Sequence, residues 1–413
     1  MFFSQTSYNL ENFKSGFKSK IYNFSKEKLI ENISNKSYGF IKCLYEDDIK
    51  KIDDVCKKLM EFKSILFLGT GGSSLGGKTL VSLKSNYYQQ DLKKNIFFIE
   101  NIDEDSIVGL LNQINLDKTA VVIISKSGET IETLSQFFFI KERMKKIKNL
   151  NERFFVITEN KRSTLKSIQE EEKFYYVEHK PDIGGRYSIF SVVGLMPAKL
   201  AGVDIKKFRD GAISFLETLL TKKIKDFDNY FLPSISMILL NRNGFNISVM
   251  MPYIEKLQNF SLWYKQLWAE STGKDGKGIT PINSLGTIDQ HSQLQLFLDG
   301  PRDKFFTIIG KKKRFDSINL DCSYGKKNYK ILDKKNLERL MYAEMKATIT
   351  TLRNKGNPLR FIELEKVDER TIGSLTMFFF LETIFCSYML EVNPFDQPAV
   401  EESKILTRKY LKK

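Results

Sequence analysis

The stretch that sets the fold class is residues 64–79, SILFLGTGGSSLGGKT. Its apolar start, residues 64–68, is typical of a buried strand, and it stops at a glycine-rich turn that opens a helical pattern. Such a turn exposes backbone N–H groups at a helix start, which favours binding of an anion. The stretch therefore predicts a strand, an anion-binding turn and a helix.

The same alternation continues along the chain. Further apolar runs occur at residues 96–99, 120–124 and 154–157, and a clear helical pattern covers 130–148. A second series has helices at 205–240, 335–352, 369–390 and 399–410, and strands at 246–251, 305–309 and 359–364. Strands alternating with helices indicate doubly wound parallel sheets, which bind ligands at the carboxyl ends of their strands.

The predicted fold class is α/β, with two doubly wound parallel-sheet units and helical extensions at both ends. The expected parts are an N-terminal helical extension (1–44), a first α/β unit (45–205), crossover helices with a second α/β unit (206–392), and a C-terminal helical tail carrying Lys404 (393–413).

Composition describes a globular protein, because 42% of the residues are hydrophobic and 28% are charged. The net charge of +15 comes from lysines scattered among acids, and the only dense basic run is residues 311–314, so we expect no nucleic-acid partner. The apolar run at 375–390 contains Glu382 and predicts a core helix rather than a membrane span. Four cysteines without metal-like spacing, and no apolar leader, predict a cytoplasmic protein.

A second hydroxyl-rich turn follows the strand at 120–124. It reads SKSGET, and it offers Ser125, Lys126, Ser127 and Thr130 just before a helix. Because neighbouring strands of a parallel sheet end at the same edge, this turn and the first one can converge on one phosphate without a metal. Each turn alone is also compatible with an ordinary glycine–serine turn.

The first turn has a rival interpretation. Residues 72–79, GSSLGGKT, match the Walker A pattern letter for letter, and they follow a predicted strand as that motif should. A P-loop NTPase is therefore an alternative. Against this alternative, no predicted strand ends in a clear magnesium-binding aspartate, and the nearest acid is Glu100.

Two further residues suit acid–base chemistry, and a third could stabilise negative charge. Glu270 ends a predicted helix and His291 begins another segment, with the polar loop 273–278 between them. Glu and His are the side chains most easily tuned for proton transfer near neutral pH, although a helix end and a structural histidine would look the same. Arg186 follows two glycines, where it could face an oxyanion or form an ordinary salt bridge. The other histidine, His179, is expected to be structural or exposed.

Taken together, these motifs resemble the glucose-6-phosphate isomerase (phosphoglucose isomerase) family. The matching pieces span most of the chain in the family's order: GTGGSSLG (69–76), ISKSGETIET (124–133), GGRYSIFSVVGL (184–195), ESTGKDGKG (270–278), GTIDQHSQLQL (286–296) and NPFDQPAVEESK (393–404).

The resemblance implies two sugar-isomerase (SIS) α/β/α sandwich domains. It implies interconversion of glucose 6-phosphate and fructose 6-phosphate through ring opening and a cis-enediol, in glycolysis and gluconeogenesis. It implies no metal and no organic cofactor, and a homodimer with shared active sites. A non-catalytic sugar-phosphate-binding protein of the same fold remains an alternative, although it would have no reason to keep all of the acid–base residues.

Carried over by motif, the resemblance also implies a role for each candidate residue. Glu270 would be the base, Arg186 would steady the enediolate, and His291 and Lys404 would open the sugar ring. Glu132 would orient His291, and Gln397 would contact the substrate. The expected phosphate-binding residues are Gly72, Ser73, Ser125, Lys126, Ser127 and Thr130.

Overall fold

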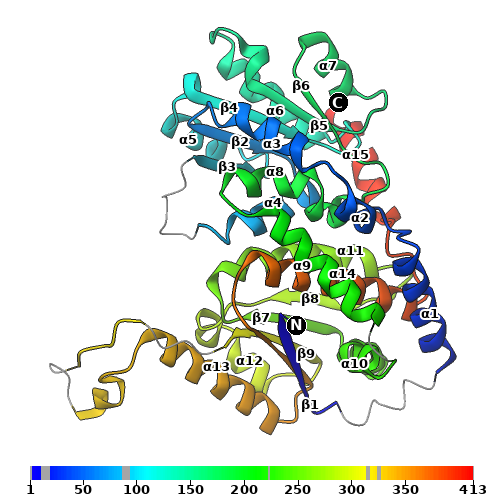
Figure 1. Cartoon of the computed structure of the whole chain (residues 1–413), viewed down its shortest axis with the longest axis vertical. Helices are drawn as coiled ribbons and strands as arrows, with labels where there is room; N and C mark the ends of the chain where they lie inside the picture. The colour runs from blue at the N-terminus through cyan, green and yellow to red at the C-terminus, as the bar shows by residue number, and fades with distance from the viewer. Residues whose placement is uncertain are drawn as a thin grey trace.

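The computed structural model describes residues 2–10, 19–85, 94–221, 224–312, 317–322 and 327–412. Two five-stranded sheets lie toward opposite ends of the molecule, with helices between them and around them (Figure 1). The predicted α/β fold class with two sheet-based units is confirmed.

The first sheet has the order β3-β2-β4-β5-β6, and every neighbouring pair is parallel. Its central strands are mostly apolar and buried at every position, as expected where helices cover both faces. The strands are β2 (Ser64–Leu68), β3 (Asn95–Ile99), β4 (Thr119–Ile124), β5 (Phe154–Thr158) and β6 (Tyr175–Glu178). The helices of this region are α3 (Ile49–Leu59), α4 (Leu75–Val81), α5 (Glu104–Gln113), α6 (Ile131–Met144), α7 (Thr164–Glu172) and α8 (Val192–Leu200).

The second sheet has the order β1-β10-β9-β7-β8, in which only β1 runs antiparallel to its neighbour. Its strands are β1 (Phe3–Tyr8), β7 (Ile247–Pro252), β8 (Thr280–Asn283), β9 (Lys304–Lys311) and β10 (Leu359–Leu364). The remaining helices are α1 (Lys20–Ser34), α2 (Gly39–Lys42), α9 (Ile205–Thr221), α10 (Ile224–Asn241), α11 (Gln258–Thr272), α12 (Leu294–Asp299), α13 (Leu337–Asn354), α14 (Glu369–Met389) and α15 (Glu401–Leu411).

The prediction of a helical extension over residues 1–44 is wrong at its start. Phe3–Tyr8 forms strand β1, which pairs with β10 from Phe3 opposite Leu364 to Tyr8 opposite Leu359. Phe3 is buried, and the strand covers an edge that would otherwise present unpaired backbone groups. A short strand whose partner lies more than 350 residues away carries little local signal.

Two smaller expectations also change. The helix before the polar loop does not end at Glu270, because α11 continues to Thr272 and so holds Glu270 within its last turn. The short strands β6 and β8 were not predicted, since their residues are only partly buried and their patterns are weak. Of the basic run 311–314, residues 313 and 314 lie outside the described residues, and Lys311 and Lys312 pair with Glu338 and Glu365.

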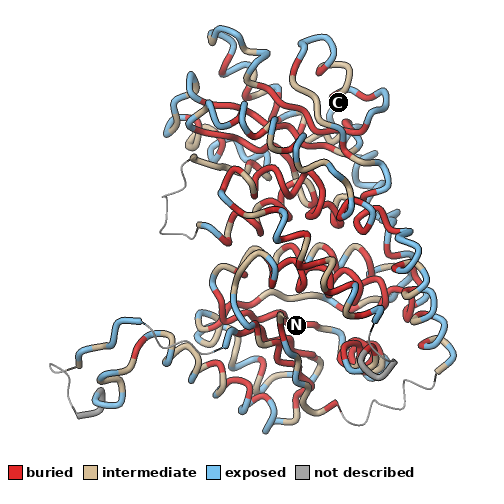
Figure 2. Tube along the Cα trace, in the orientation of Figure 1, coloured by how far each residue is buried: buried red, intermediate tan, exposed pale blue. Residues whose placement is uncertain are grey.

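Helix α14 forms the centre of the core, packed against α9, α11, α1 and α10. Among the described residues it is the one helix long and apolar enough to cross a membrane, yet it is wholly buried in the fold. Figure 2 shows buried positions along both sheets and through the helices between them. The predicted core helix over this run is confirmed.

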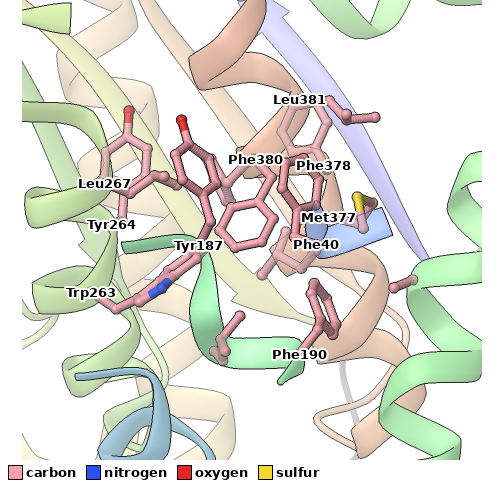
Figure 3. Packing of buried hydrophobic residues seen from close by; sticks show 14 of the residues in the cluster. Phe40, Tyr187, Phe190, Trp263, Tyr264, Leu267, Met377, Phe378, Phe380 and Leu381 are labelled. Atoms are coloured by element: carbon pink, nitrogen blue, oxygen red, sulfur yellow. The ribbon is translucent and has the colours of Figure 1, made fainter. Parts of the chain in front are cut away.

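An aromatic cluster fills the space beside the candidate site (Figure 3). The ring of Tyr187 stacks on Phe40 with centroids 5.4 Å apart, and it contacts Phe380 of α14 at 5.0 Å. Burying one such side chain stabilises a fold by roughly 1.5–3 kcal/mol. Because Tyr187 directly follows Arg186, this packing fixes the backbone from which the arginine projects.

Candidate active site

The turn after β2 lies between the end of β4 and the turn that carries Arg186. A Cβ atom on Gly69 would lie 2.8 Å from Ser73 Cβ and 3.0 Å from the carbonyl oxygen of Ile124. A Cβ atom on Gly72 would lie 2.2 Å from the carbonyl carbon of Gly185. Only glycine fits such close approaches, so the GTGG sequence brings Ser73 beside both neighbouring turns.

The turn after β4 is organised by its own hydroxyl groups. Ser125 Oγ donates to Thr130 Oγ1 at 3.0 Å and accepts from the backbone N–H of Gly128 at 3.2 Å. Ser127 Oγ accepts from the backbone N–H of Glu129 at 3.1 Å. These contacts preform a small loop with several donor groups, which is the arrangement that a phosphate dianion requires.

Lys126 adds a cation to this loop. Its Nζ atom donates to the carbonyl oxygen of Pro181 at 2.8 Å and lies 3.6 Å from the carboxylate of Glu159. His179 is buried nearby, with Nδ1 3.0 Å from the carbonyl oxygen of Lys180. Burial lowers the pKa of His179, so its ring is neutral in the folded chain. The structure therefore places His179 in a structural position.

Arg186 is the most constrained side chain of the site, with only 3% of it exposed. Its Nε atom donates to Ser271 Oγ at 2.9 Å, and one terminal nitrogen donates to Glu270 Oε2 at 3.1 Å and to Gln397 Oε1. The other terminal nitrogen donates to the carbonyl oxygens of Pro394 at 2.6 Å and Asp396 at 3.0 Å. The guanidinium plane is therefore held rigidly, as a fixed positive charge.

Glu270 lies opposite this arginine, in the last turn of α11. Its Oε1 atom accepts from Gln266 Nε2 at 2.9 Å, and its Oε2 atom accepts from Arg186. The side chain is 30% exposed, so the carboxylate is oriented by the protein and still open to a ligand. A fixed carboxylate beside a fixed cation can move a proton and stabilise the negative charge that results.

Sequence reasoning missed two residues of this site. Gln266 holds the second oxygen of Glu270, and its only signal was the helical spacing of four residues. Lys274 lies in the loop after α11. Only 8% of its side chain is exposed, although the polar composition of the loop predicts side chains that face solvent. Its burial depends on chain segments far away in sequence, so no local pattern could reveal it.

The structure does not bring His291 and Lys404 to Glu270 within one chain. His291 is exposed in the turn after β8, and within the described ranges its side chain makes no hydrogen bond or ion pair. Lys404 is exposed on α15 and pairs with Glu401 at 2.5 Å. Glu132 lies in the first turn of α6, and in the described part of the chain it makes no hydrogen bond to His291. Gln397, by contrast, is in the site.

Residues 72–79, which match the Walker A pattern, do not offer the unpaired lysine and hydroxyl groups that a P-loop needs. Lys78 Nζ pairs with Glu100 Oε2 at 2.5 Å, and Ser74 Oγ donates to the same carboxylate at 2.6 Å. Thr79 is fully buried and donates its hydroxyl to the carbonyl oxygen of Asn259 at 3.0 Å. A P-loop lysine must reach phosphates and its Ser or Thr must reach magnesium, so the NTPase interpretation is not favoured.

Comparisons with known proteins point to one family. A family model described as phosphoglucose isomerase matches residues 41–313. The chain is 35% identical over 404 residues to a probable glucose-6-phosphate isomerase of Methanococcus maripaludis, covering 96% of this chain and 90% of the relative. It is 32% identical over 394 residues to a glucose-6-phosphate isomerase of Methanocaldococcus jannaschii, covering 93% and 92%.

Solved structures show the same fold. A hypothetical protein from Thermus thermophilus superposes with a TM-score of 0.85 at 27% identity, covering 99% of this chain and 100% of that one. A glucose-6-phosphate isomerase from Chlamydia trachomatis superposes with a TM-score of 0.75 at 23% identity, covering 89% and 73%.

Proposed function

The chain belongs to the phosphoglucose isomerase family, and from that premise we propose that it interconverts glucose 6-phosphate and fructose 6-phosphate at the site around Arg186 and Glu270. This aldose–ketose isomerisation is a step of glycolysis and, in the opposite direction, of gluconeogenesis. The observation that carries the proposal is the 3.1 Å contact between the Glu270 carboxylate and the buried Arg186 guanidinium, beside the glycine–serine turn after β2.

Glu270 is the proposed base. In the open-chain aldose it takes the proton from C2, and the electrons of that bond form the C1–C2 double bond. The electrons of the C1 carbonyl bond move to its oxygen, which takes up a proton, and the product is a cis-enediol. The carboxylic acid then returns the first proton to C1, while the C2 hydroxyl gives up its proton and becomes the ketone. No atom is gained or lost overall. Gln266 and Arg186 hold the two carboxylate oxygens and so aim the base at both carbons.

Arg186 is the proposed electrostatic partner. Negative charge develops on the C1 and C2 oxygens as the proton leaves, and a guanidinium that cannot move stabilises that charge without reorganisation. Removing one such group commonly lowers the rate by about a hundredfold or more. Gln397, which accepts from Arg186, is the proposed contact to a substrate hydroxyl.

The phosphate is assigned to the two turns at the carboxyl edge of the first sheet. Gly72 and Ser73 come from the turn after β2, and Ser125, Lys126, Ser127 and Thr130 come from the turn after β4. Supporting this assignment, Ser73 lies beside the end of β4, and Lys126 adds a positive charge. Backbone N–H groups and hydroxyls recognise a phosphate oxygen without a metal.

Ring opening is assigned to His291 and Lys404, which requires a second copy of the chain. His291 is exposed and unpaired among the described residues, and α15 is exposed along its whole length, including Ile405, Tyr410 and Leu411. We propose a homodimer in which His291 of one subunit reaches the site around Glu270 of the other, with Glu132 orienting the imidazole. Exposed apolar side chains on this helix support an interface there.

The proposed location is the cytoplasm. Cys43, Cys56 and Cys386 are buried free thiols, and Cys322 is also free. Burial raises the pKa of Cys43 and of Cys56 to about 12, so these thiols are unreactive. Reduced cysteines in the core support a reducing compartment.

A coupled assay with fructose 6-phosphate, run with and without EDTA, tests the function. Wild-type chain should form glucose 6-phosphate at the same rate in both conditions. Glu270→Gln should lower kcat by at least about a hundredfold while sugar-phosphate binding persists. Glu255→Gln, at an exposed glutamate outside the site, is the matched control. Binding without turnover by the wild type would instead indicate a sugar-phosphate-binding protein.

A further inference from the structure

The side chain of Lys274 is largely shielded from solvent although it lies in a polar loop. Its side chain is only 8% exposed, and its ammonium donates to the carbonyl oxygens of Glu270 at 2.8 Å, Ser271 at 2.9 Å and Asn393 at 2.6 Å. An ammonium group has three donors, so these three carbonyls occupy all of them. Lys274 therefore has no donor left for a substrate.

These contacts join two distant parts of the chain. Glu270 and Ser271 belong to the last turn of α11, where a cation is also favoured by the helix dipole. Asn393 begins a short segment, residues 393–397, which we term the tail turn. It lies 119 residues from Lys274. The lysine thus ties the end of α11 to the tail turn.

The same tail turn holds Arg186. Its Pro394 and Asp396 carbonyls accept from the guanidinium at 2.6 and 3.0 Å, and its Gln397 side chain accepts as well. Asp396 also faces the lysine, with its carboxylate 3.4 Å from the Lys274 ammonium. Two cations therefore bind the tail turn. One is Arg186, and the other is Lys274, which lies just after the helix that carries Glu270.

This arrangement fixes the relative position of base and cation. Glu270 moves with the last turn of α11, whereas Arg186 is bound to the tail turn. Lys274 bonds to both of these segments, so it resists their separation. Burial and the charge of Arg186 lower the pKa of Lys274, which means that the carbonyls and Asp396 must compensate for desolvation.

We propose that Lys274 is a positioning residue for the isomerisation, which sets the Glu270 carboxylate against the Arg186 guanidinium by joining α11 to the tail turn. The inference rests on the proposed function. Misplacing a base by about 1 Å can lower a rate by roughly a hundredfold, so removing Lys274 should act on the chemical step. A purely structural lysine would instead lower thermal stability and leave kcat of the folded protein unchanged.

Lys274→Met in the full chain tests this, because methionine keeps most of the apolar length and removes the donors. We expect kcat with fructose 6-phosphate to fall about tenfold to a hundredfold, with KM within about threefold because the phosphate turns belong to the first sheet. Melting temperature is measured in parallel. The matched control is Lys277→Met, since Lys277 donates to the carbonyl of Leu390 at 2.9 Å, outside the tail turn and away from Glu270.

Lys274→Arg supplies the second measurement if the methionine variant does not fold. It keeps the charge, but a planar guanidinium cannot direct its donors to the same three carbonyls, so kcat should still fall. A wild-type kcat in either folded variant, or an equal fall in Lys277→Met, would overturn the proposal. An inactive wild type would refute the proposed function itself, whereas an active wild type with an active Lys274 variant would refute only this inference.

Discussion

Arg186 and Glu270 are 84 residues apart in sequence, yet their side chains lie 3.1 Å apart in the folded chain. The arginine also bonds to Ser271, the next residue of the same helix, at 2.9 Å. The base and its electrostatic partner are therefore held together by the fold itself. Such preorganisation means that the site does not have to reorganise as charge develops during the reaction.

Replacing Arg186 by lysine should impair catalysis strongly. Lysine keeps the charge but cannot bond to Ser271, Glu270 and the tail-turn carbonyls at once. We expect kcat to fall by about a hundredfold or more. The measurement is the coupled isomerase assay, with Arg302→Lys as the control because Arg302 bonds to the carbonyl of Gly356, outside the site. An Arg186→Lys enzyme with wild-type kcat would contradict the assigned role.

Mixing two inactive variants should restore activity if the sites are shared. In a hybrid of Glu270→Gln and His291→Ala chains, one site has both intact residues and the other has neither. Random exchange should therefore return about a quarter of wild-type activity. The coupled assay is run after exchange has been proven with differently tagged chains. No recovery would show that each chain uses its own His291.

Replacing Lys78 by methionine should leave isomerisation nearly unchanged. Its ammonium is held by Glu100 rather than directed to the phosphate turns. We expect kcat/KM within about threefold of wild type, because a partly exposed ion pair contributes little. Equilibrium dialysis with Mg-ATP should detect no binding that depends on Lys78. Binding that the substitution abolishes would revive the P-loop interpretation.

Stability should fall on the acidic side of pH 6.5 because of His179. Burial lowers the pKa of His179 from 6.5. As the pH falls, the unfolded chain therefore binds a proton at this residue before the folded chain does. The contribution is present above that pH and is lost as pH falls toward the folded pKa. Urea midpoints between about pH 7.5 and 5.5 measure the loss.

His179→Asn should reduce that acidic loss, and His291→Asn should not, since the ring of His291 is exposed. These are the only two histidines in the chain, so the pair forms a complete control. Identical pH dependence in the wild type and His179→Asn would refute the assignment.

Breaking the buried ion pair of the second sheet should destabilise the fold. Arg360 and Glu382 are both fully buried, and Glu382 Oε2 accepts from the guanidinium at 2.8 Å. Glu382→Gln leaves the arginine uncompensated, which typically costs about 3–5 kcal/mol. Urea denaturation measures it, and Asp54→Asn, at an exposed pair with Lys57, should cause no measurable change. An unchanged midpoint in Glu382→Gln would contradict the inferred role of the pair.

The sequence by itself determined the alternation of strands and helices, the two hydroxyl-rich turns and the family. These features are local, because burial on both faces demands continuous apolar runs and a tight anion-binding turn demands glycine. The resemblance in turn supplied the candidate roles of Glu270, Arg186 and Gln397, which the fold then brought into contact.

Only the tertiary structure decided which distant segments meet. Phe3–Tyr8 became an edge strand because it pairs with the otherwise open edge of β10. Lys78 of α4 became paired because Glu100, which directly follows β3, lies within reach of its ammonium. The side chain of Lys274 is shielded because its ammonium bonds to the tail turn, 119 residues away. Such outcomes depend on contacts between segments that share no local pattern, so composition and periodicity could not reveal them.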